Sequence, residues 1–175
     1  MTDAPVGKKG LSTGAIIAIV AGVVVLVVVA VVGVMAALGI AGFRNYLSAA
    51  KSAEGRAEVG RLARGMALCG PGRGADGQSA ALPPTAPPVP ATLSEVSGKK
   101  YMSSSADWSD PAYTCAAFSV SMPQYFRYQW LATSDTKGVA RAEADLDGDG
   151  TPEVIFESKV TCAGEDCTAG PITPP

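Results

Sequence analysis

The sequence contains no histidine. This absence excludes Ser-His-Asp and Cys-His nucleophile systems and every metal site that needs an imidazole ligand. Charged residues are also scarce, at 17% of 175 residues, and the net charge of −2 provides no basic surface for nucleic acid. The composition therefore predicts neither an enzyme nor a partner of nucleic acid.

One long segment has no charge at all, between Lys9 and Arg44. Residues 15–42 within it are almost wholly apolar and exceed the ~20 residues that a helix needs to cross a bilayer. A helix is favoured in lipid because it satisfies its own backbone, whereas the apolar region of a signal peptide has only ~7–15 residues. We expect a retained transmembrane helix at 11–42, after a short cytoplasmic leader-like segment at 1–10.

All four cysteines follow this segment. An even number without a CxxC pair or histidine is typical of disulfides rather than zinc, the alternative being free buried thiols. Three pairings are possible, and the short spacing favours Cys162 with Cys167, which leaves Cys69 for Cys115. Basic residues after the helix would place the C-terminal part in the cytoplasm. We give the cysteines more weight and expect a single-pass inner-membrane protein whose C-terminal domain lies in the periplasm.

The remaining chain divides by composition. Residues 43–69 carry an apolar stripe without proline, which predicts an amphipathic continuation of the helix. Residues 70–100 are rich in proline and glycine and predict an extended surface loop. Residues 101–161 alternate with a period of two, which predicts an antiparallel sheet domain, and 162–175 form a disulfide-looped tail.

The fold class predicted by this order is α+β, a long helix packed on a small antiparallel sheet. Two pairs of strands are expected, the first joined by a turn at 122–124 and the second by an Asp/Gly-rich loop. The strands are 113–121, 126–132, 139–144 and 154–160.

The Asp/Gly-rich loop reads DLDGDGTPE. Calcium prefers six to eight oxygen ligands, and alternate carboxylates around glycines supply several of them. The glutamate that closes an EF-hand is missing, so the loop resembles other calcium loops in β contexts. The alternative is a hairpin turn without an ion. The expected ligands are the carboxylates of Asp145, Asp147, Asp149 and Glu153 and the backbone carbonyl of Thr151.

The chain resembles type IV pilins and pseudopilins in its helix, VGVMAALGIAGFRNY followed by LSAAKSAEGRAEV, and downstream in LCGPG, KYMSSSADW, TCAAFSV, PQYFRYQW and ARAEADLDGDG. The likeness is closest to pilin-like proteins of delta-proteobacteria such as the myxobacteria, and it spans residues 32–156. It implies a filament subunit that assembles through its hydrophobic helix with other pilin-like subunits and the pilus assembly machinery, in the inner membrane or in an extracellular pilus.

The resemblance also implies a leader cut after a glycine, followed by methylation of the new N-terminus. Gly10 and Leu11 stand at such a position, although the fifth residue after Gly10 is Ala15, where the family has glutamate. The alternative function is a non-polymerising single-pass protein that presents a calcium-stabilised binding domain. Small residues that would allow close packing of helices are Gly33, Ala36, Ala37, Gly39 and Gly42.

Overall fold

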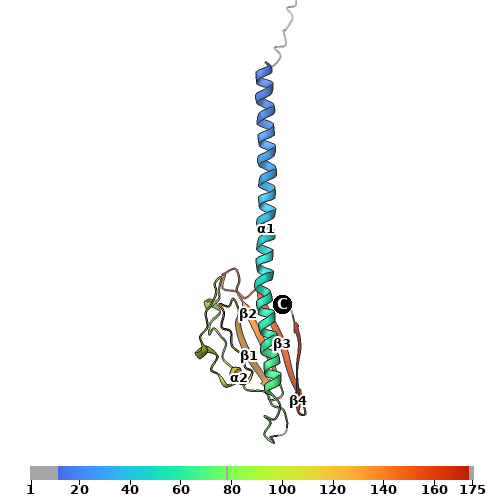
Figure 1. Cartoon of the computed structure of the whole chain (residues 1–175), viewed down its shortest axis with the longest axis vertical. Coiled ribbons are helices and arrows are strands. Elements are labelled where there is room, and N and C mark those ends of the chain that lie inside the picture. Colours follow the sequence, from blue (N-terminus) through green and yellow to red (C-terminus); the bar gives the residue numbers. More distant parts are fainter. Residues whose placement is uncertain (1–11, 78, 174–175) are drawn as a thin grey trace, which may run out of the picture. The chain divides into compact units, whose positions relative to one another are not determined.

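The computed structural model describes residues 12–77 and 79–173. The chain divides into two compact units, Met1–Tyr46 and Leu47–Pro175, and helix α1 (Thr13–Cys69) begins in the first and ends in the second. The expected α+β class is confirmed, since an apolar N-terminal helix is followed by a small antiparallel sheet (Figure 1). The expected cut between Gly10 and Leu11 lies outside the described residues.

The described part of the first unit is a single aliphatic helix. The hydroxyl of Ser12 accepts a hydrogen bond from the amide of Ala15 at 3.4 Å and caps the first turn. The segment Thr13–Gly39 has a mean hydropathy of 3.4, and none of its most apolar window is buried inside the protein. Leu26 and Leu38 are 71% and 69% exposed. This helix is long and apolar enough to cross a membrane, and no described part of the chain covers it.

In the second unit, the end of α1 packs on a four-stranded sheet. The residues of the expected apolar stripe, Val59, Leu62 and Met66, are fully buried. They belong to one core with aromatic side chains of the sheet, among them Tyr128 and Trp130. The amphipathic stripe was therefore predicted correctly as a core face.

The sheet is an antiparallel meander in the order β1-β2-β3-β4. Its strands are β1 (Arg127–Ser134), β2 (Lys137–Ala144), β3 (Val154–Ala163) and β4 (Asp166–Thr173). Large and small side chains face each other across it, with Trp130 opposite Ala140 and Phe156 opposite Ala142. The expected pairing of the last two predicted strands is confirmed, because β2 pairs with β3.

The strand expected at 113–121 is wrong. A short helix, α2 (Pro111–Cys115), occupies its first part, because Asp110 caps the amide of Ala112 at 2.9 Å and a proline occupies the first turn. Beyond it, Phe118 and Val120 are buried while their neighbours are exposed, which explains the period of two without a strand.

Two further expectations need correction. The C-terminal segment 162–175 is not only a looped tail, because its residues 166–173 form β4 of the sheet. The turn at 122–124 does not join two strands, since the backbone of Gln124 pairs with Tyr101 at 2.8 and 2.9 Å. The polar residues of β4 gave no strong strand pattern, and strand pairing to β3 decides its conformation.

The proline-rich loop lies along the outer edge of β1 rather than free on the surface. The amide of Ala86 donates to the carbonyl of Trp130 at 3.1 Å, and Val89 and Tyr128 exchange two hydrogen bonds of 2.9 Å. At the opposite edge, β4 contains Pro171 and its register with β3 shifts between Ser158 and Val160.

The cysteines form two disulfides, Cys69–Cys115 and Cys162–Cys167. The first closes a separation of 46 residues, a loop that contributes about 4 kcal/mol in the chain-entropy model. It ties the end of α1 to α2, rather than to a strand as expected. The second closes the turn between β3 and β4.

Close packing requires a glycine at position 65 of α1. A Cβ at Gly65 would overlap the carbonyl oxygen of Ala116, whereas one at Gly60 would meet only the flexible ends of Arg64 and Ile172 at 3.2 Å. We predict that Gly65→Ala lowers the free energy of unfolding by about 1–3 kcal/mol through overpacking. Thermal unfolding of the full chain in lipid measures this loss.

The matched control is Gly60→Ala, which gains helix propensity and is expected to change the free energy of unfolding by less than about 1 kcal/mol. Equal stabilisation by both substitutions would contradict the close contact between Gly65 and Ala116.

Glu54 joins α1 to the start of the sheet. Its Oε1 accepts hydrogen bonds from the amide of Tyr125 at 2.9 Å and from the hydroxyl of Tyr128 at 3.4 Å. Burial raises the pKa of Glu54 above its ordinary value of 4.5, while these two hydrogen bonds and Lys100 oppose the rise. The folded state therefore binds this proton more tightly than the unfolded state.

The stabilising effect of that proton is complete below about pH 4.5 and is lost as the pH rises through the folded pKa of Glu54. Glu54→Gln stays neutral and keeps the accepting oxygen. We predict that the melting temperature of this variant minus that of the parent is larger at pH 7.5 than at pH 4. Glu165→Gln, on the exposed β3–β4 turn, controls for the change in net charge, and a difference that does not vary with pH would contradict the prediction.

Candidate functional site

The acidic loop connects β2 to β3. Asp145 directly follows β2, Glu153 directly precedes β3, and Ala144 pairs with Val154 across the base. The amide of Glu153 donates to the carbonyl of Ala144 at 3.1 Å. The hairpin therefore holds both ends of the loop, as the sequence predicts.

The structure brings the four predicted carboxylates together. One oxygen of each lies within 4.8 Å of the corresponding oxygens of the others. Asp145 is fully buried, and the other three side chains are exposed. The residues of this group are Asp145, Asp147, Asp149 and Glu153.

Asp145 organises the loop. Its Oδ1 accepts a hydrogen bond from the amide of Gly148 at 2.7 Å, and its Oδ2 accepts from the amide of Gly150 at 2.8 Å and from the hydroxyl of Ser97 at 2.5 Å. The hydrogen bond from Ser97 and those from the two amides lower the pKa of Asp145 below its ordinary value. This carboxylate is therefore kept charged inside the loop.

Two of these partners must be glycine. Gly148 and Gly150 have φ angles of 85° and 92°, which L side chains rarely adopt. The turns place their amides over Asp145. A side chain at Gly148 would also approach Gly98, whose own amide donates to the carbonyl of Asp145 at 2.9 Å.

The exposed carboxylates are oriented in the same way by local amides. Asp147 accepts from the amide of Asp149 at 3.1 Å, Asp149 accepts from that of Thr151 at 2.7 Å, and Glu153 accepts from that of Leu146 at 2.9 Å. Such turns are common in loops of aspartate and glycine. Each of these hydrogen bonds is accepted by one oxygen of the carboxylate.

The negative charges of the group are close enough to influence each other. Loss of hydration beside the loop is the main cause that raises the pKa of Glu153, and the hydrogen bond and charge of neighbouring Asp147 raise it further. The donor set consists only of hard oxygen atoms, so its chemistry fits calcium better than a soft metal. The group can hold a hard cation.

The amide of Thr151 donates to Asp149 at 2.7 Å, and the carbonyl of Thr151 as a calcium ligand stays a prediction. The sequence did not indicate Ser97, which donates the shortest hydrogen bond of the loop. Ser97 precedes Asp145 by 48 positions, so no local motif relates the two residues.

The second candidate site is the exposed surface of the N-terminal helix. A Cβ added at Gly33 or Gly39 would meet no atom within 4 Å, and Ala36 and Ala37 are exposed. The surroundings of Gly42 are outside the part of the chain whose side-chain environment is described. Gly33, Ala36, Ala37 and Gly39 are therefore open to contact from another molecule.

No family model, curated protein or solved structure matches the chain. Two features of the described residues stand out chemically, the exposed apolar helix and the acidic loop.

Proposed function

We propose that this protein is a structural subunit of a filament of the type IV pilus or pseudopilus kind. The apolar part of α1 anchors the subunit in the inner membrane before assembly and packs against the same helix of neighbouring subunits afterwards. The sheet domain forms the surface outside the membrane.

The uncovered helix surface is the observation that carries the proposal. Large aliphatic side chains along Thr13–Gly39 are more than half exposed on all sides, including Ile17 at 64% and Leu26 at 71%. Water cannot cover so much apolar surface without a large free-energy cost, so lipid or other helices must do so. Gly33 and Gly39 favour the second partner, because small residues let helix backbones approach each other.

The two disulfides support an extracytoplasmic position of the sheet domain. Disulfides persist in oxidising compartments such as the periplasm. Both of them, Cys69–Cys115 and Cys162–Cys167, lie in the second unit. The membrane helix and the disulfides together agree with a subunit that crosses the inner membrane once.

The acidic loop is proposed to bind calcium. Asp147, Asp149 and Glu153 are exposed and lie near the buried charge of Asp145, and a divalent cation would relieve their mutual repulsion. The ion would stabilise the loop without taking part in a reaction. Its role is therefore structural.

The alternative is a single-pass membrane protein that does not polymerise and presents the sheet domain to the periplasm. The lack of a glutamate near the start of the helix favours this alternative, since Ala15 stands at the relevant position. A charged group in lipid is costly unless it is paired, so such a glutamate would fix the register between subunits. Lipid alone would then cover the helix.

Gly39→Leu separates the two functions. Because a Cβ there meets nothing within 4 Å, the variant is expected to keep its stability and membrane insertion. In a filament, the larger side chain would block close approach of helices. We predict that the amount of protein in sheared surface fractions falls by about tenfold or more, which corresponds to a loss of about 1.4 kcal/mol in the free energy of association. Quantitative immunoblots of membrane and sheared fractions measure this loss.

Gly22→Leu is the matched control, because Gly22 is equally open but lies outside the predicted small-residue set. Intact mass and N-terminal sequencing of both fractions add a second criterion. A chain that starts at Leu11 in the sheared fraction supports the filament. A chain that starts at Met1 and is found only in membranes supports the alternative.

Calcium binding is tested by thermal unfolding of the full chain in lipid. We predict that calcium raises the melting temperature, since a ligand at 100 times its Kd stabilises the folded state by about 2.7 kcal/mol. Asp147→Asn together with Asp149→Asn should abolish the increase. Asp166→Asn, an exposed acid at the start of β4, should retain it, and an unchanged melting temperature of the parent at millimolar calcium would overturn the proposal.

A further inference from the structure

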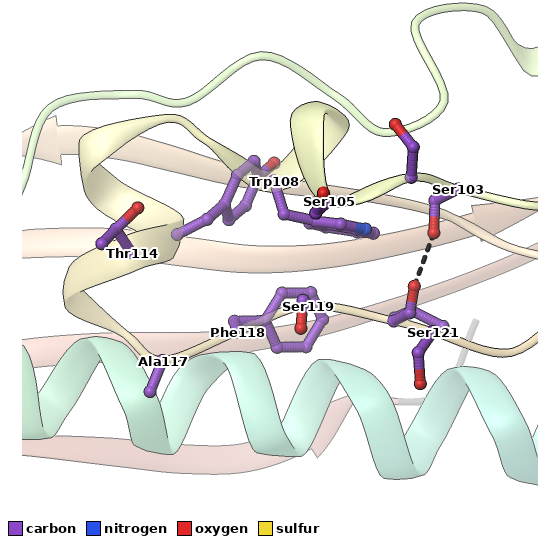
Figure 2. Close-up of a pocket in the computed structure, with 11 residues that line it drawn as sticks. Ser103, Ser105, Trp108, Thr114, Ala117, Phe118, Ser119 and Ser121 are labelled. Atoms are coloured by element: carbon purple, nitrogen blue, oxygen red, sulfur yellow. Dashed lines mark hydrogen bonds between the residues drawn. The ribbon is translucent and has the colours of Figure 1, made fainter.

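The second unit also contains a pocket whose residues differ from those of the acidic loop. This pocket of about 510 Å³ opens between the 3-10 helix η2 (Ser105–Trp108) and the segment 117–121, which is extended beyond Ala117 (Figure 2). Its volume falls in the range of about 300–1,000 Å³ that is common for small-molecule sites. The pocket shares no residue with the acidic loop.

The lining is uncharged and rich in hydroxyl groups. Aromatic and aliphatic side chains, including Trp108 and Phe118, form the buried part of the wall. Among residues 12–77 and 79–173, no aspartate, glutamate, lysine or arginine lines the pocket, so this lining offers no counter-ion to a phosphate, a carboxylate or an amine. The hydroxyl groups come from Ser103, Ser104, Ser105, Thr114, Ser119 and Ser121.

The indole nitrogen of Trp108 is an unused donor in this wall. Trp108 is only 4% exposed, and its Nε1–H has no hydrogen-bond partner among the described residues. The other tryptophan, Trp130, is also buried, but its Nε1–H donates to the carbonyl of Pro83 at 2.9 Å. A buried donor without an acceptor is costly, so its retention at a pocket indicates an acceptor from outside the chain.

The indole ring cannot turn to find an acceptor inside the protein. The rings of Tyr113 and Phe118 pack edge-on against it, each with its centroid at 5.1 Å. The hydroxyl of Tyr113 is itself committed to the carbonyl of Pro87 at 2.6 Å. Figure 2 shows the indole nitrogen on the side of the ring that faces Ser103.

The backbone of the extended wall is largely in use. The amide of Phe118 donates to the carbonyl of Tyr113 at 2.9 Å, the carbonyl of Ser119 accepts from Arg61 at 2.5 Å, and the carbonyl of Val120 accepts from the hydroxyl of Ser103 at 2.5 Å. A peptide added as a strand would need these groups free. Side-chain hydroxyls are therefore the main polar groups that the pocket offers to a ligand.

We propose that this pocket binds a neutral saccharide. One ring or hydroxyl oxygen of the sugar accepts the hydrogen bond of Trp108 Nε1–H. The hydroxyls of Ser105, Thr114, Ser119 and Ser121 both donate to and accept from the remaining sugar hydroxyls. The hydroxyls of Ser103 and Ser104 already donate to Val120 and Asp107, so they serve the sugar as acceptors. The apolar wall around Phe118 contacts the C–H groups of the sugar ring. The sheet domain thus has a carbohydrate-recognition surface in addition to its role in a filament or at a membrane.

The two tryptophans provide an internal control for the test. The full chain, labelled with ¹⁵N-tryptophan, is placed in phospholipid nanodiscs free of sugar-based detergent, and the two indole N–H signals are assigned with Trp108→Phe. Glucose, galactose, mannose, N-acetylglucosamine and their methyl glycosides are then titrated. We expect the signal of Trp108 to move downfield and saturate with at least one sugar, while the signal of Trp130 does not move.

Variants of the rim test the hydroxyl contacts. Ser105→Ala and Thr114→Val alter exposed side chains, so they should fold like the parent. Each is expected to weaken binding by about three- to tenfold, the fold-change of one neutral hydrogen bond. Ser109→Ala is the matched control, since Ser109 is exposed next to η2 but does not line the pocket, and it should leave binding unchanged.

The proposal is overturned if the indole signal of Trp108 stays unchanged up to about 50 mM of every sugar, a concentration far above the usual Kd of such sites. Equal movement of both indole signals would also overturn it. So would movement of the Trp108 signal with an uncharged dipeptide amide but with none of the sugars. A preference for a methyl glycoside over the free sugar would identify the end of a longer glycan as the ligand, and the reverse preference a free sugar.

Discussion

The second unit depends on the contact between one face of α1 and the aromatic face of the sheet. Val59, Leu62 and Met66 are buried there against the same core that contains Trp130 and Phe156. Burial of large aliphatic and aromatic side chains provides most of the stability of so small a domain. Other links, such as the disulfide between the end of α1 and α2, join elements of this same core region.

The sequence predicted those elements whose periodicity is produced by that core. The stripe in α1 and the strands β1 to β3 each bury one side, so their patterns are visible without a structure. The segment 113–121 misled the prediction because buried Phe118 and Val120 alternate with serines in a loop. Its true signal was local, the cap and proline that begin α2.

Long-range polar contacts account for what the sequence could not predict. The aspartates of the acidic loop were identified because they are neighbours in sequence, whereas Ser97 reaches Asp145 from 48 positions away. The isolation of the Trp108 indole was equally invisible, because a missing hydrogen bond depends on all elements that surround the ring. Strand β4 was missed because its pairing with β3, and not its own pattern, determines its conformation.

Both edges of the sheet are poor templates for another strand. The proline-rich segment already bonds to the edge of β1, and β4 has an irregular register and a proline without an N–H group. Copies of this domain can therefore be crowded together, or refold beside one another, without joining edge to edge into a continuous cross-β assembly. Association is thereby directed to surfaces formed by side chains.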